Sequence, residues 1–206
     1  MYSKGIKRIL DFCISFCGFI VLSPLFIVLC ILIKITSPGP VFFKQKRVGI
    51  HKTHFNILKF RTMRIDTPKD VPTHMLTNPD QYITSVGKFL RKTSLDELPQ
   101  LINIIKGDMA IVGPRPALWN QYDLIEERDK YRANDVMPGL TGWAQINGRD
   151  ELEIPVKAKL DGEYVQRQSF LFDCKCFLMT ITSVLKHDGV VEGGTGEMQN
   201  RRNESD

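Results

Sequence analysis

The sequence predicts an α+β protein: an N-terminal re-entrant membrane helix-hairpin followed by a compact, mostly helical cytoplasmic domain with a small β-sheet. Residues 12–33 are 22 consecutive uncharged residues, whereas residues 34–64 carry eight Lys or Arg and no acid. With 206 residues, 43% of them hydrophobic, the chain can bury a core without disulfides or metals, and its composition excludes disordered and fibrous proteins. We expect a membrane segment over 1–36, the cytoplasmic domain over 37–190 and a tail over 191–206.

The uncharged segment is long enough to cross a bilayer. As a helix it would extend about 33 Å, against about 30 Å for the hydrocarbon core. Pro24 lies near its middle and removes a backbone hydrogen bond, and the Ser23 hydroxyl can satisfy a freed carbonyl. Basic residues flank both ends, and the positive-inside rule assigns each end to the cytoplasm. Two interpretations stay open on these residues: a helix that breaks and returns to the same face, or a kinked span with its more basic side cytoplasmic.

The net charge of +5 conceals a segregation along the chain. Residues 1–33 carry +2, residues 34–64 carry +8 and the remainder carries −5. A uniformly basic nucleic-acid binder would not show this pattern, so we expect no nucleic-acid partner. Positive charge beside the apolar segment indicates membrane lipids or phosphate ligands. The five cysteines form no C-x-x-C pair, which argues against a disulfide framework or zinc ribbon and favours small buried hydrophobes in a reducing compartment.

Local patterns predict the elements of the cytoplasmic domain. The strongest helix is expected over 95–105, where apolar residues recur at helical spacing before Gly107. Aperiodic residues predict loops over 65–80 and 138–148. Strands are expected over 41–43, His54–Phe60 and Ala110–Val112, and further helices over 83–91, 119–132, 151–164 and 173–186.

The acidic pair Asp96-Glu97 heads the strongest predicted helix. Ser94 and Glu97 match a capping box, and acids in a first turn complement the helix dipole, so capping is favoured for this motif on its own. The alternative is a reactive pair, in which one carboxylate oxygen attacks phosphorus while the site binds Mg²⁺. Adjacent helix residues point about 100° apart, so the two carboxylates would have different roles.

Three basic residues are candidates for phosphate binding. Arg115 lies in a rigid Gly-Pro-Arg-Pro turn, which suits bidentate phosphate contact, although pairing with a surface acid is an equal alternative. Lys59 and Arg61 would share one strand face with Phe60 in the core. Two cations on one face suit a diphosphate at the membrane interface or contact with anionic lipids.

The Gly-rich segment 138–149 contains side chains typical of sites that bind sugars or bases. Gln145, Asn147 and Arg149 offer hydrogen bonds, and Trp143 offers a flat face. The alternative is a tight turn with a packed tryptophan. The segment matches neither a Walker loop nor a dinucleotide fingerprint.

Five motifs occur in an order that is similar to a known family. They are the Ser23-Pro24 break, Lys-Phe-Arg-Thr-Met from residue 59, Thr-Ser-Leu-Asp-Glu-Leu-Pro-Gln-Leu from residue 93, Lys-Gly-Asp-Met-Ala-Ile-Val-Gly-Pro-Arg-Pro from residue 106, and Pro-Gly-Leu-Thr-Gly-Trp-Ala-Gln-Ile-Asn-Gly-Arg from residue 138. The chain resembles the bacterial sugar transferase family of small monotopic phosphoglycosyl transferases, from residue 3 to about residue 190.

The resemblance implies an activity and a location. Members of the family transfer a phosphosugar from a UDP-sugar to polyprenyl phosphate on the cytoplasmic face of the bacterial inner membrane. UMP leaves, and the polyprenyl-diphosphate-sugar starts the synthesis of a surface glycan or glycoprotein that downstream glycosyltransferases extend. The resemblance also supports the re-entrant hairpin, because Ser23-Pro24 matches the dipeptide that breaks the membrane helix of the family.

The resemblance further implies roles for individual residues. Asp96 would attack the phosphorus that bears the sugar, forming a covalent aspartyl-phosphosugar intermediate, and would bind Mg²⁺ with the assistance of Glu97. The other matched positions are expected near the substrates: Lys59 and Arg61 in the first motif, Arg115 at a phosphate oxygen, Gln145, Asn147 and Arg149 near the nucleotide-sugar, and Asp161 and Tyr164 in a downstream Asp-x-x-Tyr.

Overall fold

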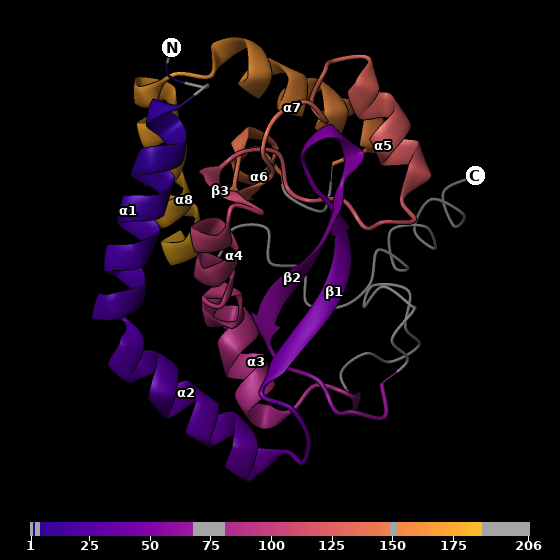
Figure 1. Ribbon diagram of the computed structural model, residues 1–206. Coiled ribbons are helices and arrows are strands. Elements are labelled where there is room, and N and C mark those ends of the chain that lie inside the picture. Colours follow the sequence, from indigo (N-terminus) through magenta and orange to yellow (C-terminus); the bar gives the residue numbers. More distant parts are fainter. Residues whose placement is uncertain (1, 3–4, 68–80, 149–151, 187–206) are drawn as a thin grey trace, which may run out of the picture.

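The computed structural model describes Tyr2 and residues 5–67, 81–148 and 152–186, and helices form most of its regular structure (Figure 1). In chain order the elements are α1 (Ile6–Val21), α2 (Ser23–Thr36), β1 (Phe42–Val48), the 3₁₀ turn η2 (Ile50–Lys52), β2 (His54–Phe60), α3 (Ser85–Lys92), the 3₁₀ turn η5 (Leu95–Glu97), α4 (Gln100–Lys106), β3 (Ala110–Val112), α5 (Tyr122–Asp129), β4 (Gly139–Thr141), α6 (Trp143–Ile146), α7 (Ile154–Arg167) and α8 (Phe170–Lys186). Most of the predicted loop 65–80 and all of the predicted tail lie outside the described residues.

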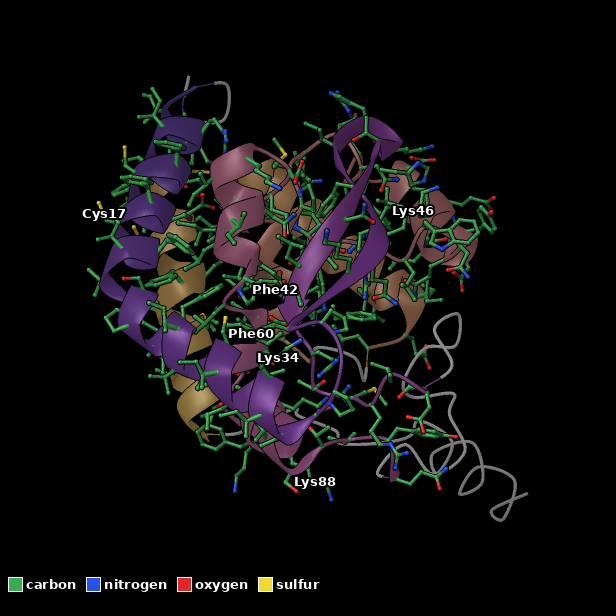
Figure 2. All side chains as sticks on the ribbon, turned by 60° about the horizontal axis from the view of Figure 1, so that its bottom comes forward. Cys17, Lys34, Phe42, Lys46, Phe60 and Lys88 are labelled. Atoms are coloured by element: carbon green, nitrogen blue, oxygen red, sulfur yellow. The ribbon has the colours of Figure 1, made fainter. Side chains whose placement is uncertain are left out.

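The predicted small sheet is two separate two-stranded sheets. β1 and β2 form an antiparallel hairpin whose register runs from Phe42 opposite Phe60 to Val48 opposite His54. β1 is longer than predicted, because its basic residues interrupt the apolar pattern. Phe60 is 1% exposed, as predicted for the core, and packs with Phe42 beside α2 (Figure 2).

The second sheet corrects the prediction that residues 138–148 form a loop. β4 pairs in parallel with β3, and α6 follows immediately. The glycines give this segment no strand-like sequence pattern, but they allow the two backbones to approach closely enough to pair. A Cβ at Gly139 would collide with the main-chain nitrogen of Gly113, and one at Gly142 with the Gly113 oxygen. Because the two chains approach so closely, side chains are excluded from the positions that would show a strand pattern.

The predicted break in the N-terminal segment is confirmed. α1 and α2 meet at Leu22 with a bend of 63°, and the Ser23 hydroxyl donates a hydrogen bond to the Ile20 carbonyl at 2.7 Å. Pro24 occupies the first turn of α2, where its missing N–H does least harm. In the described part of the chain no single helix is long and apolar enough to cross a bilayer, although the bent pair together has the required length and composition.

A buried polar network attaches the start of α1 to the rest of the molecule. Lys7 Nζ lies 2.6 Å from Asp173 Oδ2 on α8 and 3.4 Å from Asp11 on its own helix. The hydroxyl of Tyr2 also donates to Asp173, and Asp11 accepts a hydrogen bond from the Ile111 N–H in β3. α1 therefore lies beside α8 and β3 (Figure 1) with its charged groups mutually satisfied.

The expectation that the cysteines are free and buried holds only for some of them. All five are free thiols, and Cys176 is fully buried. Cys13 and Cys17, however, are exposed on α1, and Figure 2 shows Cys17 on the outer side of that helix. The prediction of burial is wrong for these two because they lie on the face of α1 that turns away from the protein.

Candidate active site

The acidic pair lies in the turn between α3 and α4. Ser94 adopts a left-handed conformation with φ 56°, and its side chain makes no capping hydrogen bond. Asp96 and Glu97 belong to the 3₁₀ turn η5, and α4 begins only after Pro99. The predicted capping box is therefore wrong, because the chain changes direction at Ser94 instead of starting one continuous helix there.

Two cations from distant segments converge on Glu97. Lys59 Nζ at the end of β2 lies 2.7 Å from Glu97 Oε1, and Arg115 Nη2, beyond the end of β3, lies 3.0 Å from the same oxygen. Lys59 is also 3.9 Å from Asp96 Oδ2. We call Lys59, Asp96, Glu97 and Arg115 the catalytic cluster. Between 13% and 36% of each of these side chains is exposed, so the cluster is accessible from solvent.

The two carboxylates of the catalytic cluster differ in pKa. Burial raises the pKa of Asp96; the charge of Glu97 adds to this effect, and Lys59 opposes it only in part. Burial would raise the pKa of Glu97 too, but Lys59 and Arg115 outweigh burial and hold the pKa of Glu97 well below its usual range. Glu97 is thus a permanent anion that anchors two cations, whereas the charge of Asp96 is less well compensated.

Arg91 on α3 is a cation near Asp96 that the sequence reasoning missed. Its positive charge lowers the pKa of Asp96, and its Nε donates a hydrogen bond to Thr62 Oγ1 at 2.9 Å. The signal in the sequence was a basic residue in the helix directly before the acidic pair. That signal was weak because α3 also carries other Lys and Arg residues.

Arg61 does not join Lys59, contrary to the prediction. β2 ends at Phe60, and the Arg61 guanidinium turns to donate hydrogen bonds to the carbonyls of Ser37 at 2.6 Å and Pro38 at 2.9 Å. Arg61 is only 6% exposed. It therefore secures the turn that follows α2, and the predicted shared cationic face does not form.

The side chains of Gln145 and Asn147 hold their own segment together. The Gln145 amide nitrogen donates to the Leu140 carbonyl at 3.0 Å, and the Asn147 amide nitrogen donates to the Trp143 carbonyl at 2.7 Å. Gln145 Oε1 is buried without a hydrogen-bond partner among the described residues. Arg149 lies outside the described residues. The hydrogen bonds of the Gln145 and Asn147 side chains therefore stay within their own segment, away from the catalytic cluster.

Trp143 is packed and does not present a free flat face. Its ring lies 5.1 Å from that of Phe172, and the cationic groups of Arg167 and Lys175 lie 5.5 Å and 5.4 Å from its centre. Its indole N–H donates to Glu163 at 3.1 Å. The tryptophan is therefore packed, as one of the two alternatives expected, but the segment forms β4 and α6 and not a tight turn.

Asp161 and Tyr164 are buried inside the domain. Asp161 is 0% exposed and accepts two hydrogen bonds from Arg128, at 2.8 Å and 2.6 Å. The Tyr164 hydroxyl lies 2.9 Å from both the Val112 carbonyl and Asp173 Oδ1. Both side chains tie α7 to α5, β3 and α8, and so support the strand that leads to Arg115. Their contact with substrate stays a prediction.

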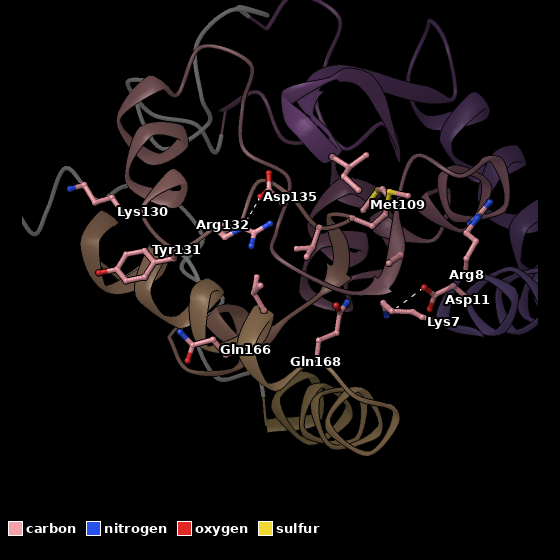
Figure 3. A pocket seen from close by; sticks show the side chains of 15 residues that line it. Lys7, Arg8, Asp11, Met109, Lys130, Tyr131, Arg132, Asp135, Gln166 and Gln168 are labelled. Carbon is pink, nitrogen blue, oxygen red and sulfur yellow. Dashed lines mark hydrogen bonds and ion pairs between the residues drawn. The ribbon is translucent and has the colours of Figure 1, made fainter. Parts of the chain in front are cut away.

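One cavity in the described part of the chain is lined by none of the four residues of the catalytic cluster. It has a volume of about 690 Å³ and is lined by Met109, Ala110 and Met137, which precede or begin β3 and β4 (Figure 3). Ion pairs such as Arg132 with Asp135 line the cavity, so its polar groups are largely engaged.

Comparison with known proteins identifies the family. A family model described as bacterial sugar transferase matches residues 2–187. An uncharacterized sugar transferase of Bacillus subtilis is 44% identical over 81% of this chain and 79% of that protein. The exopolysaccharide production protein ExoY of Sinorhizobium fredii is 37% identical over 86% of this chain and 84% of its own.

A third relative is much longer than this chain. It is the UDP-glucose:undecaprenyl-phosphate glucose-1-phosphate transferase of Escherichia coli, which is 40% identical over 87% of this chain but only 40% of its own length. The chain therefore belongs to the bacterial sugar transferase family and is a phosphoglycosyl transferase.

Proposed function

We propose that this chain transfers a phosphosugar from a UDP-sugar to polyprenyl phosphate, forming polyprenyl-diphosphate-sugar and UMP. The observation that carries the proposal is the catalytic cluster, in which Glu97 anchors Lys59 and Arg115 beside Asp96. Among the described residues no side chain donates a hydrogen bond to Asp96, so its carboxylate is available to react. Relatives named as undecaprenyl-phosphate glucose transferases support the choice of substrates.

The reaction would proceed in two displacements at one phosphorus atom. A carboxylate oxygen of Asp96 attacks the phosphorus that bears the sugar, the bond from that phosphorus to the bridging oxygen breaks, and UMP leaves with this oxygen. An oxygen of polyprenyl phosphate then attacks the aspartyl-phosphosugar intermediate, and the Asp96 carboxylate leaves. Attacking and leaving groups are anions, so neither step needs a proton donor.

The cations of the catalytic cluster would reduce the electrostatic repulsion between the attacking carboxylate and the diphosphate. A carboxylate that approaches an anionic diphosphate is repelled until positive charge offsets both groups. Lys59 and Arg115 are held in place by Glu97 and would contact the phosphate oxygens as they gain charge. Because this pairing exists before substrate binds, little reorganisation is needed at the moment of attack.

Mg²⁺ is the cofactor that we propose. Mg²⁺ keeps several waters and is typically held by one or two carboxylates plus substrate phosphates. The described residues contain no group of three or more metal-binding side chains, but a partly exposed Asp96 beside the diphosphate fits a metal that shares its ligands with substrate. Bound there by Asp96, Mg²⁺ would neutralise part of the diphosphate charge.

We further propose that α1 and α2 form a re-entrant hairpin in the bacterial inner membrane, with the catalytic domain on the cytoplasmic face. The bend of 63° and the basic residues on both flanks support this topology. Membrane lipids would then cover the exposed apolar side chains of the pair, which include Ile9, Phe16, Val21, Ile27 and Ile35. Polyprenyl phosphate would reach the catalytic cluster from the same membrane, and downstream glycosyltransferases would extend the product.

Identification of the nucleotide product tests the proposal most directly. The purified protein would be incubated with Mg²⁺, undecaprenyl phosphate and UDP-glucose or UDP-N-acetylhexosamines. We expect UMP from the wild type and at least about 10³-fold less from Asp96→Asn. Glu126→Gln, at an exposed acid on α5, is the matched control and should retain activity. Release of UDP would instead indicate a direct glycosyl transferase, and release of no nucleotide would favour a membrane scaffold.

A further inference from the structure

Asn103 on α4 pairs with the main chain of β2 in both directions. Its Oδ1 accepts a hydrogen bond from the Leu58 N–H at 2.9 Å, and its Nδ2 donates one to the Asn56 carbonyl at 2.9 Å. Among the described residues β2 has β1 on one side only, so one edge of β2 has no neighbouring strand there. The Asn103 amide thus takes the place of a neighbouring strand over one peptide repeat, and it is only 1% exposed.

A third contact fixes the orientation of this amide. Nδ2 also donates to Asp108 Oδ2 at 3.1 Å. Both hydrogens of the NH₂ group are then used, and the oxygen faces the Leu58 N–H. A flipped amide would place its oxygen against the Asp108 carboxylate and lose both bonds to β2, so only one orientation is favourable.

The Asn103 contacts join two of the three segments that form the catalytic cluster. Leu58 immediately precedes Lys59, whereas Asn103 lies in the helix that begins just after the Asp96-Glu97 turn. The contact between Lys59 and Glu97 joins residues 38 apart in the chain, and that between Leu58 and Asn103 joins residues 45 apart. Both contacts depend on the position of α4 relative to β2. The buried Asn103 side chain fixes this position through its hydrogen bonds to the main chain of β2.

We propose that Asn103 is a positioning residue for Lys59. It fixes the register of β2 against α4, so that the ammonium group reaches Glu97 and stays near Asp96. The inference rests on the proposed function for its kinetic test. A sliding of one strand against the helix by even about 1 Å would misplace Lys59, and displacements of that size can reduce catalytic rates roughly hundredfold.

The kinetic test is a double-mutant cycle. Asn103→Asp keeps the shape of the side chain but cannot donate to Asn56 or Asp108. We expect it to reduce kcat for UMP release roughly tenfold to hundredfold in the wild-type background. In a Lys59→Met background it should reduce kcat by no more than about twofold, because the residue on which it acts is already absent. Equal losses in both backgrounds would overturn the proposal and leave Asn103 with a structural role alone.

Asn134 provides the matched control. This asparagine is 6% exposed, and its amide donates to the Ile125 carbonyl and to Asp129, away from the catalytic cluster. Asn134→Asp should lower the melting temperature to a similar extent as Asn103→Asp. Its kcat, measured below both melting temperatures, should stay close to the wild-type value. An equal loss of kcat in this control would overturn the proposal.

A chemical measurement tests the positioning role of Asn103 independently of the proposed function. Lys59 acylation by an amine-reactive ester, followed by mass spectrometry, reports whether Lys59 still pairs with Glu97 and needs no enzyme activity. We expect Lys59 to react several-fold faster in Asn103→Asp, with the exposed Lys88 unchanged as internal reference. An unchanged Lys59 rate would refute the positioning role even if UMP is released. If Asn103→Asp does not fold, Asn103→Ser, which keeps one polar group for the strand edge, takes its place with the same expected outcomes.

Discussion

Two adjacent carboxylates in one turn have opposite electrostatic environments. Lys59 and Arg115 both contact Glu97, whereas the charges of Lys59, Arg91 and Arg115 offset the burial of Asp96 only in part. The pKa of Asp96 is therefore raised while that of Glu97 is lowered. A carboxylate with a raised pKa is more basic and hence a stronger nucleophile once it is ionised, which fits the division of roles proposed here.

The raised pKa of Asp96 predicts a stabilising effect of removing its charge. Above the raised pKa the folded protein carries a carboxylate that burial disfavours, so stability falls as pH rises from the ordinary Asp range of about 3.9 through that pKa. Asp96→Asn should be more stable than wild type at pH 7, by about 1 kcal/mol or roughly 2–4 °C in melting temperature. Thermal unfolding at pH 7 and pH 4 would check this, and a difference that grows toward pH 4 would contradict it.

Removing the charge of Asp161 should destabilise the protein, in contrast to removing that of Asp96, because Asp161 belongs to a buried ion pair. The side chains of Arg128 and Asp161 are 4% and 1% exposed, so removing one partner leaves an uncompensated charge. Asp161→Asn should lower the free energy of unfolding by about 3–5 kcal/mol, measured by denaturant titration. The double variant Arg128→Met, Asp161→Leu should lose less unfolding free energy, because it leaves no unpaired charge in the interior. A variant that stays stable but releases no UMP would instead place Asp161 at the substrate.

At the scale of elements, close contact between glycines aligns the strand that precedes Arg115. Gly142 passes so near Gly113 that a Cβ would collide with the Gly113 carbonyl oxygen, and the Gly113 N–H donates to the Thr141 carbonyl at 2.8 Å. The glycines of this motif therefore serve backbone packing, and through Gly113 they set where the turn with Arg115 begins.

Gly142→Ala tests this packing. The added methyl group would force the two chains apart, and we expect a loss of about 1–3 kcal/mol in unfolding free energy together with reduced UMP release, because Arg115 moves. Gly18→Ala is the control, since a Cβ there meets nothing within 4 Å and the residue lies inside α1. That variant should gain about 0.5–1 kcal/mol. A Gly142→Ala protein as stable and active as wild type would argue against the packing role.

At the scale of the molecule, the N-terminal helix pair is attached at both of its ends. Lys7 and Asp11 join the start of α1 to α8 and β3, and Arg61 holds the carbonyls of the turn that follows α2. The bend at Ser23-Pro24 lies between these attachments. Both ends of the pair therefore contact the same domain, which is the arrangement that a hairpin returning to one membrane face requires.

Cysteine labelling in intact cells tests this topology. In a variant without the five native cysteines, single cysteines would be introduced at Ser3 and at the exposed Thr36. We expect a membrane-impermeant thiol reagent to leave both unlabelled until the cells are opened. Labelling of only one of them in intact cells would show that the pair spans the membrane and would rule out the hairpin.

Much of the local structure was predictable because it depends on neighbours in the chain. A proline in an apolar segment breaks a helix wherever it lies, and Phe60 between polar residues of a strand must face the core. The acidic pair was recognisable, but its setting was not. The Ser94 capping pattern and a sharp turn have the same sequence, and only the left-handed backbone at Ser94 distinguishes them.

The sequence by itself determined the broken apolar segment, the fold class and the residues from which a phosphoglycosyl transferase site could be built. Only the tertiary structure decided which of them meet. Lys59 reaches Glu97 while Arg61, two residues later, serves a turn, because β2 ends between them and changes the direction of the chain. A charge in a sequence has many possible partners, and burial with directed hydrogen bonds selects one of them.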